Sequence, residues 1–87
     1  MDGREYIEEA SSGRYARWHV RRIARIEELA RDNAVPLERV RIVVNRDYRW
    51  NQRANRTAAE AKAIRVGQTN DNRRGYPHEI VWAFVEE

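Results

Sequence analysis

The sequence predicts an α+β (α/β) fold: one long amphipathic helix packed on a small two- or three-stranded sheet, with a second short helix. Three observations predict it. Residues 14–33 repeat their apolar side chains at the three- or four-residue spacing of a helix that lies on a core. Residues 39–50 alternate with the period of a strand, and residues 78–85 are apolar on both faces. A chain of 87 residues is short enough to form a single domain, residues 1–87, around one small core.

The N-terminal segment, residues 1–13, is acidic, and two structures compete for it. Asp2 stands three residues before Glu5, which is the spacing of a capping box and favours a short helix over residues 3–11. The competing interpretation is a brief strand over residues 4–8. A Ser-Ser-Gly sequence then interrupts the chain before the long helix begins.

The long helix is expected from about residue 14 to residue 33, with Ser12 as its N-cap and Asn33 as a left-handed C-cap. One arc of this helix faces the core and holds Tyr15, Trp18, His19, Arg22, Ile23, Ile26, Leu29 and Ala30. Another arc, the arginine stripe, consists of Arg14, Arg17, Arg21 and Arg25. Because stacked arginines repel one another, the stripe predicts neutralisation by phosphates, by an acidic partner or by the chain's own N-terminal acids.

Two strands are predicted after the long helix. Residues 39–50 have one apolar and one basic face and bend or turn near residues 45–47. Residues 78–85 are expected at the centre of the sheet, because a strand that is apolar on both faces prefers to be covered on both. Since two strands are fewer than a stable sheet needs, either the N-terminal segment supplies a third strand or the chain pairs across a homodimer.

The segment between these strands is predicted as helix and loop. Thr57 and Glu60 form a second capping box, which predicts a short helix over residues 57–66 that Gly67 closes. Residues 67–77 have the Gly, Asn, Asp and Pro content of a long exposed loop.

The composition argues against several classes of function. The chain has no Cys and only two His, so it offers no disulfide, no thiolate nucleophile and no zinc site of the usual ligand spacing. No catalytic motif, phosphate-cradling glycine loop or calcium loop is present, which predicts a non-enzyme without metal, cofactor or small-molecule substrate. No apolar run approaches the roughly 18–20 residues that span a bilayer, so we expect a soluble cytoplasmic protein that does not contact a membrane.

Positive charge is concentrated in two stretches of the chain. The net charge is only +3, but residues 14–25 carry five Arg and no acid. In residues 46–56, arginines alternate with Tyr, Trp, Asn and Gln, a composition that suits phosphate contact, base stacking and base-edge hydrogen bonds. Tyr48 and Trp50 share the strand face of the apolar residues, so they fit the core as well as an exposed surface. The predicted binding residues are Arg14, Arg17, Arg21, Arg25, Arg46, Arg49, Arg53, Arg56, Trp50, Arg73 and Arg74.

Three functions are compatible with these patterns. The first is a small interaction module whose arginine-rich surfaces bind nucleic acid or a nucleoprotein complex. The second, by analogy of size and charge, is a protein-binding inhibitor or adaptor of a larger host machine, of the kind found among phage and mobile-element products that block CRISPR complexes. The third is a structural homodimerising domain. A genome rich in Arg codons, or a solvated basic face, would explain the same arginines without any ligand.

Overall fold

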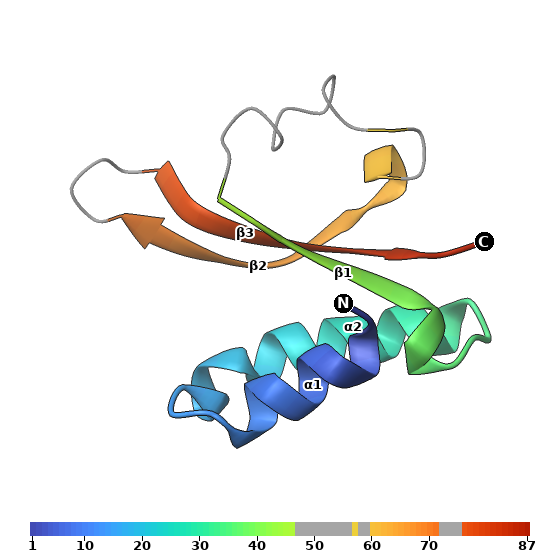
Figure 1. Ribbon diagram of the computed structural model, residues 1–87, viewed down its shortest axis with the longest axis horizontal. Helices are drawn as coiled ribbons and strands as arrows, with labels where there is room; N and C mark the ends of the chain where they lie inside the picture. Colours follow the sequence, from blue (N-terminus) through green and yellow to red (C-terminus); the bar gives the residue numbers. More distant parts are fainter. Residues whose placement is uncertain (47–56, 58–59, 72–75) are drawn as a thin grey trace.

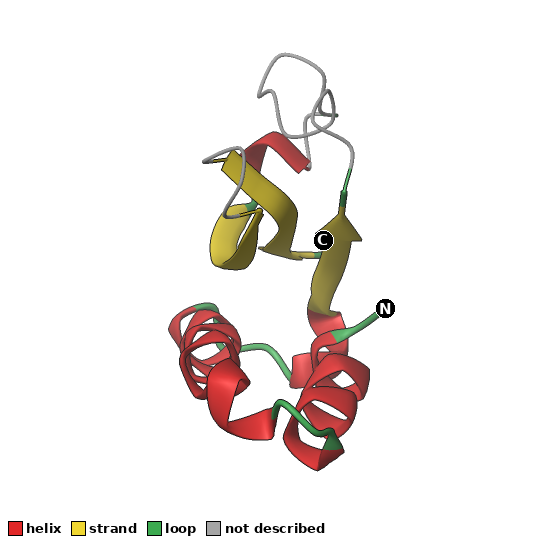
Figure 2. Cartoon of the chain, turned by 90° about the vertical axis from the view of Figure 1, so that its left-hand side faces the viewer, coloured by secondary structure: helices red, strands yellow, loops and turns green. Residues whose placement is uncertain are grey.

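The computed structural model has two layers, in which helices α1 (Gly3–Ser12) and α2 (Val20–Asp32) cover one face of a three-stranded antiparallel sheet (Figure 1). Figure 2, turned by 90°, shows both helices on the same side of the strands. The predicted α+β fold is therefore confirmed. The structure describes residues 1–46, 57, 60–71 and 76–87.

The N-terminal segment is helical, as the capping box predicted, and the competing interpretation as a strand is wrong. The carboxylate of Asp2 accepts a hydrogen bond from the backbone N–H of Glu5 at 2.9 Å, at the first turn of α1. This hydrogen bond to the charged form holds the pKa of the Asp2 carboxyl below its ordinary value.

Acid should weaken this cap. A carboxyl whose pKa is lowered by folding stabilises the folded state above its unfolded pKa, and the contribution is lost as the pH falls through the lowered value. Asp2→Asn keeps an acceptor oxygen but does not titrate. We expect the Tm of this variant to fall less below about pH 4 than the Tm of the native chain does. Thermal unfolding followed by circular dichroism measures this. Equal acid sensitivity of the two proteins would contradict the role of Asp2.

The predicted long helix is divided into two parts. A 3₁₀ helix, η1 (Ala16–His19), leads directly into α2, and neither element has a side-chain hydrogen bond from its N-cap residue. Ser12 is not the N-cap, because α1 extends through it and its hydroxyl donates to the carbonyl oxygen of Glu8 at 2.8 Å. The chain reverses direction between the two helices, and a short tight turn replaces the expected first turn of α-helix.

Asn33 is the C-cap of α2, as predicted, but it does not have the predicted left-handed conformation. Asn33 has a φ of −100°, and the left-handed residue is Ala34 with a φ of 52°. The N–H groups of Ala34 and Val35 donate to the carbonyl oxygens of Arg31 and Ala30, each at 3.0 Å. These two bonds complete a Schellman motif, which requires the left-handed conformation at the position that Ala34 occupies.

The sheet has the strand order β1 (Val40–Asn45), β3 (Tyr76–Val85), β2 (Ile64–Asp71), and both pairings are antiparallel. The central place predicted for residues 78–85 is confirmed. The strand predicted over residues 39–50 is confirmed for residues 40–45, and its end at residues 47–50 lies outside the described residues.

The third strand, β2, occupies a segment that the sequence predicted as helix and loop. The capping box is present: the Glu60 carboxylate accepts from the Thr57 N–H at 3.0 Å, and the Thr57 hydroxyl accepts from the Glu60 N–H at 3.2 Å. Among the described residues that follow it, the helix is limited to a 3₁₀ turn, η4 (Glu60–Lys62). A helix this short has little stability of its own. From Ile64 onward the chain is a strand that pairs with β3. The expected helix over 57–66 and loop over 67–77 are therefore wrong, and neither the N-terminal segment nor a second copy is needed for a third strand.

The core lies between the helices and the sheet. Tyr6 and Ala10 of α1 and Ile26 and Ala30 of α2 face the strands, so the periodicity predicted for the second half of the long helix is confirmed. The sheet contributes Val40, Ile42, Val66, Val81 and Ala83, all of them buried.

Both outer edges of the sheet form hydrogen bonds with the N-terminal part of the chain. On β1, the Ile42 N–H donates to the carbonyl oxygen of Met1 at 2.8 Å. On β2, guanidinium groups of α2 donate to the carbonyl oxygens of Val66 and Gln68. Open strand edges are sites of unwanted pairing, and these contacts cover part of each edge.

Candidate functional site

Three arginines of the predicted stripe are exposed and carry unneutralised charge. Arg14, Arg17 and Arg21 are exposed, and none of them forms an ion pair with another residue in the described part of the chain. In particular, the exposed acids of α1 do not pair with them, so the N-terminal acids do not neutralise the stripe.

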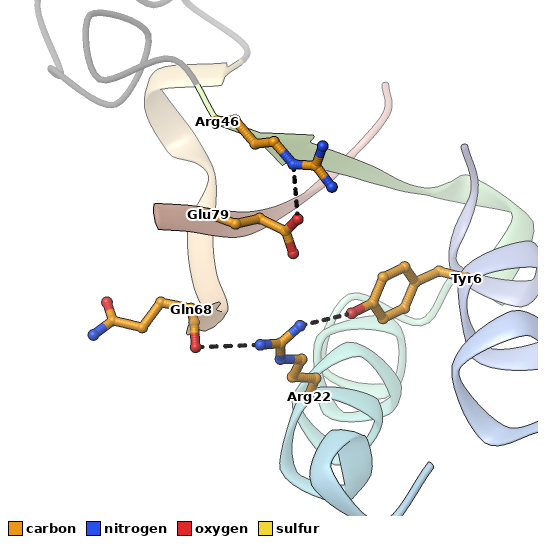
Figure 3. A network of polar contacts seen from close by, with 5 residues as sticks. All are labelled: Tyr6, Arg22, Arg46, Gln68 and Glu79. Atoms are coloured by element: carbon orange, nitrogen blue, oxygen red, sulfur yellow. Dashed lines mark hydrogen bonds and ion pairs between the residues drawn. The ribbon is translucent and has the colours of Figure 1, made fainter. Parts of the chain in front are cut away.

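The fourth member of the stripe, Arg25, has a partner within the fold. Its Nη1 donates to the carbonyl oxygen of Val66 on β2 at 3.1 Å. Arg22, which the helical periodicity placed on the core-facing arc, makes a similar contact: its Nη2 donates to the carbonyl oxygen of Gln68 at 3.2 Å, and its Nη1 to the hydroxyl of Tyr6 at 3.4 Å (Figure 3). Both side chains therefore attach α2 to the outer edge of β2.

The second predicted basic segment is described only at its first residue. Arg46 follows β1, and its Nε lies 3.2 Å from the Oε2 of Glu79 on β3, so its charge is neutralised within the sheet (Figure 3). The other predicted binding residues beyond the stripe lie outside the described residues: Arg49, Trp50, Arg53, Arg56, Arg73 and Arg74.

Two aromatic side chains that the sequence placed in the core are exposed instead. Tyr15 is 58% exposed and Trp18 is 69% exposed, so their assignment to the core-facing arc is wrong. The cause is the 3₁₀ turn, in which the Trp18 N–H donates to the carbonyl oxygen of Tyr15 at 2.9 Å. Residues three apart eclipse one another in this geometry, so the two rings follow a different direction from the core residues of α2.

The exposed aromatics and the arginines that form no ion pair with another described residue lie in one stretch of the chain, residues 14–21, in and around η1. We call it the aromatic–arginine surface and define it as Arg14, Tyr15, Arg17, Trp18 and Arg21. Within it, the guanidinium carbon of Arg17 lies 5.6 Å from the centroid of the Trp18 ring. A cation at this distance from an indole face is attracted by its π-electrons, which helps to hold the two side chains together.

A groove, here called the η1 groove, lies beside this surface where η1 meets β2. It has a volume of about 520 Å³ and is lined by Tyr15, Trp18, His19, Arg22, Gln68 and Thr69. Its Arg22 guanidinium is held in place by Tyr6 and the backbone of Gln68. The Nδ1 atom of His19 is buried and has no hydrogen-bond partner among the described residues.

The sequence contained one signal for the exposure of these aromatics. The Ser-Ser-Gly break ends only two residues before Tyr15, and the first turn of a helix is where 3₁₀ geometry is common. The groove itself could not have been predicted, because Gln68 and Thr69 belong to a strand that the local pattern did not indicate.

Two other kinds of functional feature are absent from the described residues. They contain no cluster of His, Asp and Glu that could hold a metal ion. They also contain no helix that is long and apolar enough to cross a membrane. No family model, curated protein or solved structure matches this chain.

Proposed function

We propose that this chain is a non-enzymatic nucleic-acid-binding module, and that the aromatic–arginine surface is its contact surface. The observation that supports the proposal is the exposure of Tyr15 and Trp18 next to arginines that have no acidic partner among the described residues. Large aromatic rings normally bury their apolar area, and exposed rings beside positive charge are typical of surfaces on which nucleobases stack.

The two residue types would make complementary contacts. Arg14, Arg17 and Arg21 reach into solvent, and guanidinium groups bind phosphates with two parallel hydrogen bonds. These contacts carry no sequence information, but they position the strand so that its bases meet the aromatic rings. Arg25 and Arg46 contribute less in this proposal, because the backbone of Val66 and the carboxylate of Glu79 already engage them.

Charge reversal within the surface should abolish most of the binding. For Arg17→Glu with Arg21→Glu, we expect the affinity for a labelled oligonucleotide to fall at least about tenfold at low salt, which corresponds to 1.4 kcal/mol. The slope of log affinity against log salt concentration should also decrease in magnitude, because fewer counterions are released on binding. Fluorescence anisotropy at about 50 and 200 mM salt measures both quantities.

The matched control is Arg31→Glu with Arg41→Glu, which changes the net charge by the same amount. Arg31 lies in the last turn of α2 and Arg41 on β1, and both are exposed. We expect this control to bind much better than the variant in the aromatic–arginine surface. Equal losses in the two variants would show that overall charge, and not this surface, determines binding.

A second candidate function is binding to an acidic protein surface, as an inhibitor or adaptor of a larger assembly. The observation that favours it is Val20, an aliphatic side chain that is 62% exposed directly after η1. Exposed Trp, Tyr and Arg are also the residues that contribute most to protein interfaces. Recovery of one protein partner that survives nuclease treatment, and that the same Glu substitutions abolish, would favour this function. Light scattering would detect the remaining alternative, in which the partner is a second copy of the chain.

A further inference from the structure

We infer that the η1 groove binds one unpaired nucleobase, which makes the protein selective for single-stranded over fully stacked nucleic acid. This inference rests on the proposed function and adds the kind of ligand that the groove takes. Tyr15 and Trp18 belong both to the lining of this groove and to the aromatic–arginine surface, so a strand bound along that surface would meet the groove.

The size and shape of the groove suit a flat ring. Its volume of about 520 Å³ lies within the range of about 300–1,000 Å³ that is usual for small-molecule sites. Tyr15 and Trp18 line it, and the Trp18 ring is positioned by its contact with Arg17. A base can therefore stack on an aromatic ring that is already held in place, and less conformational entropy is lost on binding.

The lining of the groove also offers polar groups for the edge of the base. Two hydrogen bonds fix the Arg22 guanidinium, to Tyr6 and to the backbone of Gln68, and a guanidinium group carries five N–H donors. Thr69 adds an exposed hydroxyl. Such donors match the oxygen and nitrogen acceptors on base edges, which base pairing occupies in a duplex. An unpaired base is therefore the ligand that this combination of stacking and donors recognises.

The test compares two single strands that differ only in their bases. One is an oligothymidine of about 12 nucleotides, and the other is an abasic strand of the same length and charge. We expect the native protein to bind the oligothymidine about 5- to 100-fold more tightly, as stacking of one base would produce. Trp18→Ala should reduce this ratio to about two or less. Trp18→Phe, which keeps a flat ring, should restore most of it.

The control variant is Val44→Ala, which removes an exposed apolar side chain from β1 and should leave the ratio unchanged. Equal affinity of the native protein for the two strands, with binding that still falls with salt, would overturn the base-binding groove and leave the proposed function standing. Absence of binding to either strand at low salt would overturn both.

Discussion

Ile26→Ala should remove about 2–5 kcal/mol from the free energy of unfolding. Ile26 is completely buried, and it lies in α2 at the point where both the sheet and the start of α1 pack against it. A Cβ on Gly3 would stand 3.2 Å from the Cγ2 of Ile26 and 2.9 Å from the carbonyl oxygen of Leu37. The backbone is therefore packed closely around this side chain, and the surroundings have little room to collapse into the cavity that Ala would leave.

A loss of this size is a large fraction of the roughly 5–15 kcal/mol that stabilises a typical domain. Urea unfolding followed by circular dichroism measures it. Two control variants provide a scale for this loss. Ile26→Val should lower the free energy of unfolding by about 0.5–1.5 kcal/mol. Val20→Ala, on the exposed side of the same helix, should lower it by less than about 0.5 kcal/mol. If the Ile26→Ala protein were as stable as the Val20→Ala protein, the placement of Ile26 in the core would be wrong.

Gly67→Ala should also destabilise the fold, by about 1–3 kcal/mol, although Ala is normally better than Gly in a strand. The reason is that a side chain at this position has no room beside Arg22. A Cβ at residue 67 would lie 2.6 Å from the Cγ and Cδ of Arg22, which cross β2 at this glycine. The φ of Gly67 is outside the left-handed region, so its backbone could otherwise accept a side chain. Arg22 must move away and lose its hydrogen bonds to Gln68 and Tyr6.

A double-mutant cycle separates this steric cause from a general weakness of the strand. In an Arg22→Ala background, Gly67→Ala should be neutral or slightly stabilising, because the side chain that blocks the Cβ is gone. The coupling between the two sites, obtained from urea unfolding of the four proteins, should be at least about 1 kcal/mol. If Gly67→Ala costs the same with and without Arg22, the close passage of Arg22 over Gly67 is not the cause.

The elements that could be predicted from the sequence depend on hydrogen bonds and spacing within a few residues. The capping bond from Glu5 to Asp2 spans three residues, and the buried pair Ile26 and Ala30 spans one helical turn. The helix that was wrongly predicted over residues 57–66 shows the limit of such signals. Its capping box forms, but a capping box orients only the first turn and does not determine how far a helix extends.

The candidate site was predicted only in part. Arg14, Arg17 and Arg21 are exposed and have no acidic partner among the described residues, which agrees with the stripe, whereas Arg25 contacts the fold itself. The aromatic half of the site was missed because one 3₁₀ turn changes the direction of the side chains before α2 begins. A helical projection assumes a constant rotation per residue, and it fails where that rotation changes.

The sequence by itself determined the local features: where α1 is capped, which face of α2 is apolar, and that residues 78–85 belong at the centre of a sheet. Only the tertiary structure decided that Ile64 pairs with Ala83 to form β2, and that Arg22 and Arg25 fasten α2 to its edge. The physical reason is distance along the chain. Contacts within one or two turns leave a periodic pattern in the sequence, whereas a contact between a guanidinium group and the backbone of a remote strand leaves none.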